Sequence, residues 1–315
     1  MEEIGYRGKH YTIPALDTAG ALTIEARPDV DVDLPEASPI LDKIGSVWDL
    51  ENFKIPRQPV RLGHVPESQR AAIVRPGMPR TLDMPIKFPG SPFRVPAAFA
   101  QLEWLVQRVA DIEAAVNPRH FDEFYCYMTV DQGDVPAGSL QREAPCHVDG
   151  FQGARWTPKV RINHTYTISD VLPTAYYVQP FDFTGLDEAR HNFFWEMNRQ
   201  VAETNSAHEW HADPWELTLM DAYTVHRGAA APVATPRTWI RLSFEVRIFD
   251  RLGNARNPLF RYDWPMHPRD IEGLGLEVFA PDSDPSLRVF PWQDVDGNPH
   301  PDRRQRTRPN LRPRG

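Results

Sequence analysis

Cysteine is scarce in this sequence, and its scarcity excludes two kinds of architecture. The 315 residues include two cysteines, Cys126 and Cys146. Two thiols can form neither the disulfide framework of a small secreted domain nor the thiolate cluster of a structural zinc site. We therefore expect reduced thiols in a chain that folds around a hydrophobic core, since 41% of its residues are apolar.

Long apolar runs are also absent. No stretch of about 18 consecutive apolar residues occurs, as a membrane-spanning helix would need. The first residues, MEEIGYRGKHYT, lack the basic and then apolar pattern of a signal peptide. The sequence thus predicts no membrane partner, and the cytoplasm is the expected compartment.

Positive charge is in short supply. The chain has 35 Lys and Arg against 43 Asp and Glu, a net charge of -8, which disfavours a nucleic-acid partner because neutralising phosphates requires clustered cations. The end of the chain, DRRQRTRPNLRPRG, is rich in arginine but also in proline, and it is poor in apolar residues. We interpret it as a mobile or surface-wrapping tail.

Proline, by contrast, is abundant, with 32 residues spread along the chain. Because proline interrupts helices, the sequence favours short strands joined by turns. Residues 1–95 hold a proline every few positions, and we expect them to form an irregular N-terminal segment packed on the core. The core is expected at 96–255, and residues 256–315 are expected to form a C-terminal extension with the Pro/Arg-rich tail.

Periodicity divides the core region into helices and strands. Apolar residues recur at helical spacing over 97–116, where Asn-Pro ends the pattern, and a second helix is expected over about 187–203. Aromatic and β-branched runs predict strands at 121–130, 159–168, 173–180, 215–226 and 238–249. The last run alternates between apolar and polar positions, as a strand with two different faces does. The pattern predicts a mainly β fold, a sandwich or barrel with flanking helices.

A histidine followed two positions later by an aspartate can supply two ligands of a non-haem metal site. The chain has four such pairs, which are His120/Asp122, His147/Asp149, His211/Asp213 and His300/Asp302. A centre of two imidazoles and one carboxylate also needs a later histidine, on a strand that folds back onto the first pair. This requirement separates the four pairs.

The pair that begins at His147 meets the requirement best. No histidine follows His300, and His226 comes too soon after His211 for several strands to intervene. His120 begins a strand directly after the end of a helix, where an aspartate is equally expected in solvent. His147 precedes His226 by enough residues for several strands, so these histidines and the aspartate of the same motif are the candidate metal ligands.

The strand after His226 carries further polar groups on one face. Arg237, Arg241 and Ser243 occupy alternate positions and so point to the same side of the strand. Burying an arginine is costly unless it meets an anion. If this face lines the interior, a dicarboxylate would satisfy it, since an arginine and a hydroxyl together can hold a carboxylate.

In this order, the polar residues resemble the site of the Fe(II)- and 2-oxoglutarate-dependent oxygenases: His147, Asp149, His226, Arg237, Arg241 and Ser243. The resemblance covers residues 120–250, and the spacing after the distal histidine is most similar to the taurine dioxygenase branch. It implies a double-stranded β-helix core, which is the jelly-roll or cupin-like fold. It also implies that His147, Asp149 and His226 bind the iron.

The resemblance implies roles for the remaining residues as well. Arg241 would bind the distal carboxylate of 2-oxoglutarate, helped by Ser243 or by Thr174, which occupies a similar place between the ligands. Arg237 would lie near the other carboxylate or the substrate. With O2, 2-oxoglutarate would be converted to succinate and CO2 while a small-molecule substrate is oxidised, most simply by hydroxylation of an unactivated C–H bond.

Two further features bear on the substrate. Related halogenases have a small residue at the position of Asp149, so the aspartate favours oxygenation, while desaturation, ring formation and epimerisation stay open. Arg155 and Trp156 directly follow the His-x-Asp motif and are candidate substrate contacts. His208 and His211 are expected in a loop beside the site or on the surface, the alternative being a separate zinc site.

Three other interpretations remain open. The iron could act as an oxygenase or oxidase without 2-oxoglutarate, with the arginines serving a carboxylated substrate. The chain could be a cupin-like binding protein without catalysis. A zinc hydrolase with the same ligands would give no reason for Arg241. The sequence makes no prediction of the oligomeric state.

Overall fold

The computed structural model describes residues 2–6, 9–13, 15–27, 29–140, 146–149, 161–186, 193–249 and 253–262. The strands are β1 Glu2–Tyr6, β2 Lys9–Ile13, β3 Leu22–Ile24, β4 Val60–His64, β5 Thr81–Lys87, β6 Phe93–Val95, β7 Tyr125–Val135, β8 His164–Ser169, β9 Ala175–Tyr177, β10 Glu209–His211, β11 Glu216–Asp221, β12 His226–Arg227 and β13 Thr235–Glu245. The α-helices are α1 Glu67–Ile73, α2 Glu103–Val116 and α3 Phe193–Glu203. Short 3-10 helices are η1 Leu41–Lys43, η2 Leu50–Lys54, η3 Ala97–Leu102 and η4 Phe121–Glu123.

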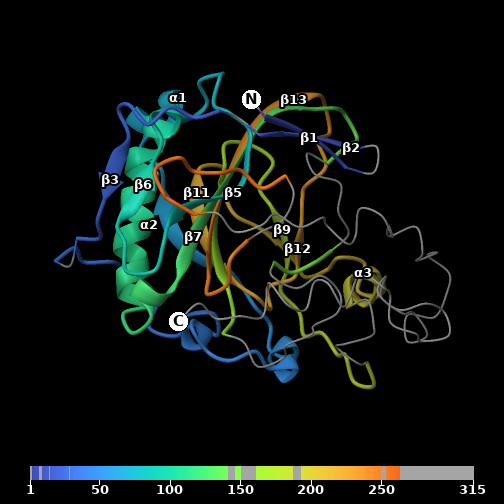
Figure 1. Cartoon of the computed structure of the whole chain (residues 1–315). Coiled ribbons are helices and arrows are strands. Elements are labelled where there is room, and N and C mark those ends of the chain that lie inside the picture. The colour runs from blue at the N-terminus through green and yellow to red at the C-terminus, as the bar shows by residue number, and fades with distance from the viewer. Residues whose placement is uncertain are drawn as a thin grey trace.

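Two antiparallel sheets form the centre of the molecule (Figure 1). The larger has six strands in the order β4-β11-β8-β13-β7-β5, and the smaller has three in the order β10-β9-β12. Their inner side chains meet, since Thr167 of β8 is hydrogen-bonded to Tyr176 of β9 with 2.7 Å between the oxygens. Neighbouring strands come from distant parts of the sequence, as in a jelly roll. The predicted fold, mainly β with a jelly-roll core and flanking helices, is confirmed.

β13 separates an apolar core from a polar interior. It pairs antiparallel with β7 along its whole length and with β8 on its other side. Ile240, Leu242 and Phe244 are buried in the main hydrophobic cluster, to which α2 also contributes. Because side chains alternate along a strand, Arg241 and Ser243 project from the opposite face, toward the smaller sheet.

The expected helix at 97–116 is present in two parts, η3 and α2. Phe99 has φ -118° and ψ 18°, outside the helical range, and its ring is fully buried. The chain therefore bends at this point, and α2 begins at Glu103. Leu105, Val109 and Ile112 lie on one side of α2 and join the main cluster, so that α2 covers the outer face of the larger sheet (Figure 1).

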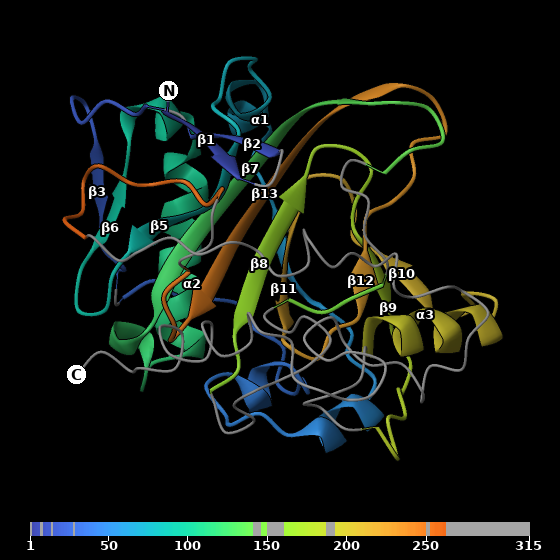
Figure 2. The same cartoon turned by 45° about the vertical axis from the view of Figure 1, so that its right-hand side comes forward.

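α3 lies on the other side of the molecule, beyond the smaller sheet (Figure 2). Phe193, Met197 and Val201 are spaced four residues apart, so they share one face of the helix. They are buried in a second hydrophobic cluster, which also contains Tyr177 of β9. The sequence predicts a helix over about 187–203. Its first part, residues 187–192, lies outside the described residues.

The segment before residue 96 is more regular than its prolines suggest. β4 and β5 are the two outermost strands of the larger sheet. An edge strand leaves part of its backbone outside the ladder, and there proline is tolerated because its missing N–H is not required; Pro85 lies within β5. Here proline marks the sheet edge and does not exclude a strand. The division into 1–95, 96–255 and 256–315 stays a prediction.

The remaining strand predictions correspond to β7, β8, β9, β11 with β12, and β13. Phe121–Glu123, expected at the start of a strand, is the 3-10 helix η4, and β7 begins at Tyr125. In the described part of the chain, no helix combines the length and apolar character needed to cross a membrane. Cys126 and Cys146 are buried free thiols.

Candidate metal centre

His147, Asp149 and His226 come together at the inner face of the smaller sheet. Each offers a ligand atom, and these atoms lie within 4.8 Å of one another. The ring centroids of His147 and His226 are 4.5 Å apart, and His226 Nε2 is 4.0 Å from Asp149 Oδ1. The three residues that the sequence selects as candidate ligands are therefore neighbours in space.

The backbone of the smaller sheet sets the positions of both histidines. His147 and His226 form an antiparallel bridge in which each N–H donates to the other carbonyl, at 3.0 and 2.9 Å. His226 is also paired with Tyr176 of β9, and Tyr176 with Trp210 of β10. Paired residues project to the same side of a sheet, so the four rings form one row. The centroid distances along this ring row are 4.5, 6.0 and 5.6 Å.

The hydrogen bonding of His226 prepares it to bind a metal. Its Nδ1 lies 2.9 Å from the carbonyl oxygen of Thr224, which can only accept, so Nδ1 carries the proton and Nε2 is the basic nitrogen. Burial lowers the pKa of His226, although Asp149 acts in the opposite direction. A neutral imidazole oriented by an outer hydrogen bond is the form in which histidine binds metals.

The donor set fits a divalent transition metal such as iron. Two imidazoles and one carboxylate are the ligands of non-haem iron centres that keep positions open for reactants. The Thr224 carbonyl is the outer hydrogen-bond partner that metal-binding histidines normally have.

A second group with ligand spacing occurs in the described residues, but an arginine side chain already neutralises its carboxylates. His64 and Asp213 are exposed and Glu216 is buried, and the three lie close together. Arg61 bridges the two carboxylates, at 2.8 Å from Asp213 and 2.7 Å from Glu216. The guanidinium thus balances the charge that a metal would otherwise balance.

The larger sheet presents a second row opposite the ring row. Thr129, Arg241, Thr167 and Thr218 are adjacent in register on β7, β13, β8 and β11. Thr167 Oγ1 is 2.9 Å from Thr218 Oγ1 and 2.7 Å from the hydroxyl of Tyr176. The hydroxyls of both sheets thus form one network beside the candidate ligands.

Our reading of the sequence missed the threonines and Tyr176. A signal for them exists, because YMTV, HTYTIS and ELTLMD each place one of these threonines within a buried strand. A hydroxyl in such a strand requires a partner. What the local sequence does not contain is the register that brings the three threonines into line.

Arg241 is enclosed by two carboxylates. Its Nη1 donates to both oxygens of Asp149, at 3.0 and 3.1 Å, and its Nη2 donates to Asp83 Oδ1 at 2.6 Å. Its guanidinium lies 5.5 Å from the ring centre of Trp239. Burial acts to lower the pKa of Arg241, but the two carboxylates outweigh it and the pKa is raised. The charge of Arg241 is therefore balanced within the protein.

Arg237 has a different environment on the same face of β13. It is 6% exposed, and its Nε donates to the carbonyl of Val171 at 3.1 Å, a neutral acceptor. Burial lowers the pKa of Arg237 to about 10, although Asp170 and Asp131 act in the opposite direction. For Arg237 desolvation dominates, and an anion beside the guanidinium would offset it.

The other predicted site residues are placed as follows. Thr174 is buried just before β9, and its side chain hydrogen-bonds Tyr176. Ser243 is buried on β13 and accepts a hydrogen bond from Thr165 Oγ1 at 3.3 Å. Arg155 and Trp156 lie outside the described residues.

His208 and His211 lie at an exposed edge of the smaller sheet. His211 is the last residue of β10, and its Nε2 is 2.8 Å from Glu209 Oε1. Neither histidine belongs to a group with ligand spacing in the described part of the chain. The surface location agrees with the expectation from sequence; His208 lies in a turn, whereas His211 lies in a short strand.

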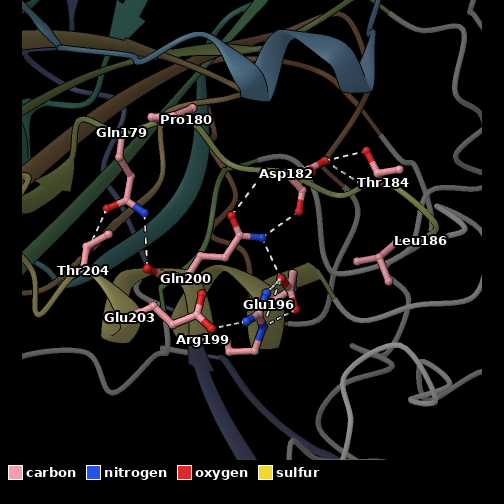
Figure 3. A pocket seen from close by; sticks show the side chains of 10 residues that line it. All are labelled: Gln179, Pro180, Asp182, Thr184, Leu186, Glu196, Arg199, Gln200, Glu203 and Thr204. Carbon is pink, nitrogen blue, oxygen red and sulfur yellow. Dashed lines mark hydrogen bonds and ion pairs between the residues drawn. The ribbon is translucent and has the colours of Figure 1, made fainter.

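A separate polar cavity of about 670 Å³ lies along α3 (Figure 3). Three of its four charged side chains pair with one another, since Arg199 binds both Glu196 and Glu203. Gln200 donates to Glu196 and to the carbonyl of Asp182, at 2.6 Å each. The cavity contains none of the candidate ligands, and its three carboxylates, Asp182, Glu196 and Glu203, outnumber its one guanidinium, Arg199.

No family model and no curated protein matches the sequence. Solved structures match the fold, among them EvdO2 from Micromonospora carbonacea var. aurantiaca complexed with 2-oxoglutarate, at 13% identity and a TM-score of 0.31. That match covers 46% of this chain and 64% of EvdO2, so it spans less than two thirds of that protein.

Two further structures match over more of their length. HygX from Streptomyces hygroscopicus with nickel and 2-oxoglutarate bound is 12% identical, with a TM-score of 0.34 and coverage of 72% of this chain and 93% of HygX. EctD from S. alaskensis with bound Fe is 14% identical, with a TM-score of 0.35 and coverage of 82% of this chain and 98% of EctD. The likeness of this chain to the three structures is one of fold.

Proposed function

We propose that this protein is a non-haem Fe(II)- and 2-oxoglutarate-dependent oxygenase that acts on a small-molecule substrate. The observation that carries the proposal is the convergence of two histidines and one aspartate, with ligand atoms within 4.8 Å of one another. They lie in a polar interior that also contains two arginines. A purely structural metal site would need neither the arginines nor the hydroxyl network.

His147, Asp149 and His226 would hold the iron by one imidazole nitrogen each and one carboxylate oxygen, which leaves further positions open for reactants. When bound, iron(II) with 2-oxoglutarate and O2 supplies an oxidant that can attack an unactivated C–H bond, with release of succinate and CO2. The protein's part is to orient the ligands and to anchor the cosubstrate in a site shielded from water.

We assign the distal carboxylate of 2-oxoglutarate to Arg237 in preference to Arg241. Arg241 already donates to Asp149 and Asp83, so an added carboxylate there would meet two like charges. Burial dominates the environment of Arg237 and lowers its pKa to about 10, so an incoming anion stabilises this guanidinium more. The sequence resemblance gives the distal carboxylate to Arg241, and this proposal moves it to Arg237.

Tyr176 and Thr174 would complete the anchor. Tyr176 interacts electrostatically with Arg237, and its ring lies 6.0 Å from that of His226. Its hydroxyl, which is hydrogen-bonded to Thr167 and Thr218, would contact the chain of a dicarboxylate held between the arginine and the metal ligands. Thr174, whose side chain is hydrogen-bonded to Tyr176, would orient that hydroxyl. Ser243 already accepts a hydrogen bond from Thr165.

Hydroxylation is the proposed outcome for the substrate. Asp149 occupies a ligand position that a halide would need, and this favours oxygenation. Arg155 and Trp156 stay candidates for substrate contact because they follow the metal-binding motif directly in sequence.

The test is an anaerobic titration of the metal-free protein with Fe(II), followed by 2-oxoglutarate. We expect one iron per chain and a weak visible charge-transfer band when the keto acid chelates the iron. His226→Ala should abolish iron binding and the band together, because the centre loses a ligand. Succinate release with candidate small molecules then identifies the substrate.

Paired variants test the anchor. Arg237→Gln should weaken 2-oxoglutarate binding about tenfold to hundredfold, since a charged hydrogen bond is lost, while Arg199→Gln on α3 should leave it unchanged. Loss confined to Arg241→Gln would assign the carboxylate to Arg241 instead. Iron binding without the band would favour an iron oxygenase that does not use 2-oxoglutarate. Absence of metal binding would contradict the proposal and favour a cupin-like binding protein.

A further inference from the structure

A carboxylate from the N-terminal segment, that of Asp83, contacts Arg241 beside the candidate metal centre. Asp83 lies in β5, where the register with β7 shifts between Thr81 and Met84. Its backbone has φ of 46°, in the left-handed region that L-residues rarely adopt. Strain of this kind is retained at positions where the side chain has a task.

The contacts of Asp83 lead to Arg241. Its carboxylate accepts from Arg241 Nη2 at 2.6 Å and from Thr129 Oγ1 at 3.1 Å. Its own N–H donates to Thr129 Oγ1 at 3.0 Å, so the unusual backbone is fixed by the same threonine. Both Asp83 and Arg241 have side chains that are 13% exposed, so solvent screens the pair weakly.

Charge explains why a carboxylate is needed there. Arg241 donates to both oxygens of Asp149, which is also a candidate metal ligand. A divalent metal on Asp149 would repel the guanidinium, and a guanidinium alone would compete with the metal for the carboxylate. A second carboxylate on the far side of Arg241 offsets its charge and fixes its position.

We propose that Asp83 is a positioning residue of the metal centre, whose carboxylate holds Arg241 and offsets its charge so that Asp149 can bind a divalent metal while accepting hydrogen bonds from Arg241. The inference rests on the proposed function and adds a residue outside the predicted site. Asp83 acts through Arg241 and touches neither metal nor substrate.

A purely conformational role makes a different prediction. Asparagine tolerates the left-handed region and can accept from Thr129, and glycine adopts that region without strain. If the backbone were all that mattered, Asp83→Asn and Asp83→Gly would keep the affinity for metal. If the charge matters, both variants lose affinity, and Asp83→Gly does so even though it relieves the strain.

The experiment is a titration of the metal-free full chain with Co(II), an oxygen-stable probe whose visible spectrum reports the ligand geometry. We expect Asp83→Asn and Asp83→Gly to raise the dissociation constant about tenfold or more, as changes in outer hydrogen-bond partners do, and to shift the spectrum. The matched control is Asp111→Asn on α2, which removes a buried carboxylate paired with Arg27 and should leave both readouts unchanged.

A double-mutant cycle tests whether Asp83 acts on the metal centre through Arg241. In an Arg241→Gln background, Asp83→Asn should change the Co(II) affinity much less than in the wild type, because the two side chains act together. An equally large effect in both backgrounds would overturn the proposal, and so would Asp83 variants that bind Co(II) like the wild type. A wild-type protein that binds neither Co(II) nor Fe(II) would overturn the proposed function as well, which distinguishes the two failures.

Discussion

At the scale of single residues, one backbone carbonyl determines the chemistry of His226. The Thr224 carbonyl fixes the proton on Nδ1. The unprotonated Nε2, which lies 4.0 Å from Asp149 Oδ1, is therefore the nitrogen that can bind a metal. The two arginines of β13 differ for a similarly local reason. Arg241 donates to two carboxylates, whereas Arg237 donates through Nε to the neutral carbonyl of Val171.

A residue-scale prediction concerns pH and stability. Burial would raise the pKa of Asp111, but hydrogen bonds from Arg27 and Gln107 outweigh it and the pKa lies below its usual 3.8. A carboxyl with a depressed pKa contributes stability that is fully present above 3.8 and is lost as the pH falls through the lower folded value. Asp111→Asn should therefore be less stable than wild type at pH 7, and the difference should narrow below pH 3.8.

Urea unfolding of both proteins at a series of pH values measures this difference. A gap in the free energy of unfolding that stays constant from neutral to acid pH would mean that the Arg27 pair has no charge component. Wild-type stability alone is a poorer readout, because other carboxyls titrate in the same range.

At the scale of elements, α3 contacts the segment that carries the candidate ligands His147 and Asp149. Asn198 Oδ1 accepts from the backbone N–H of Cys146 at 3.1 Å, and its Nδ2 donates to the Cys146 carbonyl at 3.4 Å. One turn earlier on the helix, Phe194 packs edge-on against the ring of His147 at 5.9 Å. This segment is thus tied to α3 on one side and to His226 on the other.

Asn198→Ala should weaken metal binding about tenfold, since the support of a ligand is lost, and should lower the free energy of unfolding by about 1–3 kcal/mol because a buried N–H loses its acceptor. Asn198→Asp keeps that acceptor and should retain part of the affinity. Glu203→Gln on the same helix, where the side chain is 57% exposed, is the control. Equal metal affinities in all four proteins would show that α3 does not support the site.

At the scale of the whole molecule, the N-terminal segment belongs to the sheet. β4 and β5 are its outermost strands, and Val60, Leu62, Met84 and Ile86 contribute to the main hydrophobic cluster. A chain shortened to begin at residue 96 would expose the edges of β11 and β7 and leave the cluster open to water.

We expect that shortened chain to lose both cooperative thermal unfolding and Co(II) binding. Removing residues 1–13 is the control, because β1 and β2 pair with each other in a sheet of their own, and it should preserve both properties. Cooperative unfolding of the chain from residue 96, near the wild-type temperature, would support the division at 95 and 96 instead.

Part of this architecture is readable in the sequence. Helical spacing over 97–116 locates α2 because one face of a helix is buried along its whole length. The alternation along β13 separates its two faces for the corresponding reason in strands. The order His147-x-Asp149 and then His226 suffices to select three residues whose ligand atoms lie within 4.8 Å of one another.

The rest depends on pairings between distant segments. Thr129, Thr167 and Thr218 align with Arg241 because three antiparallel registers coincide, and no single segment contains that information. Asp83 was missed because its strand lies in a proline-rich stretch that we expected to be irregular.

The sequence by itself therefore determined the class of fold and the candidate ligands, since periodicity and residue order are local properties of the chain. The tertiary structure alone decided that Arg241 lies between two carboxylates and that Arg237, on the same face of β13, is buried with its Nε donating to a neutral carbonyl. That decision depends on burial and on charges brought together across strands, because the energy of a buried charge is set by its neighbours in space.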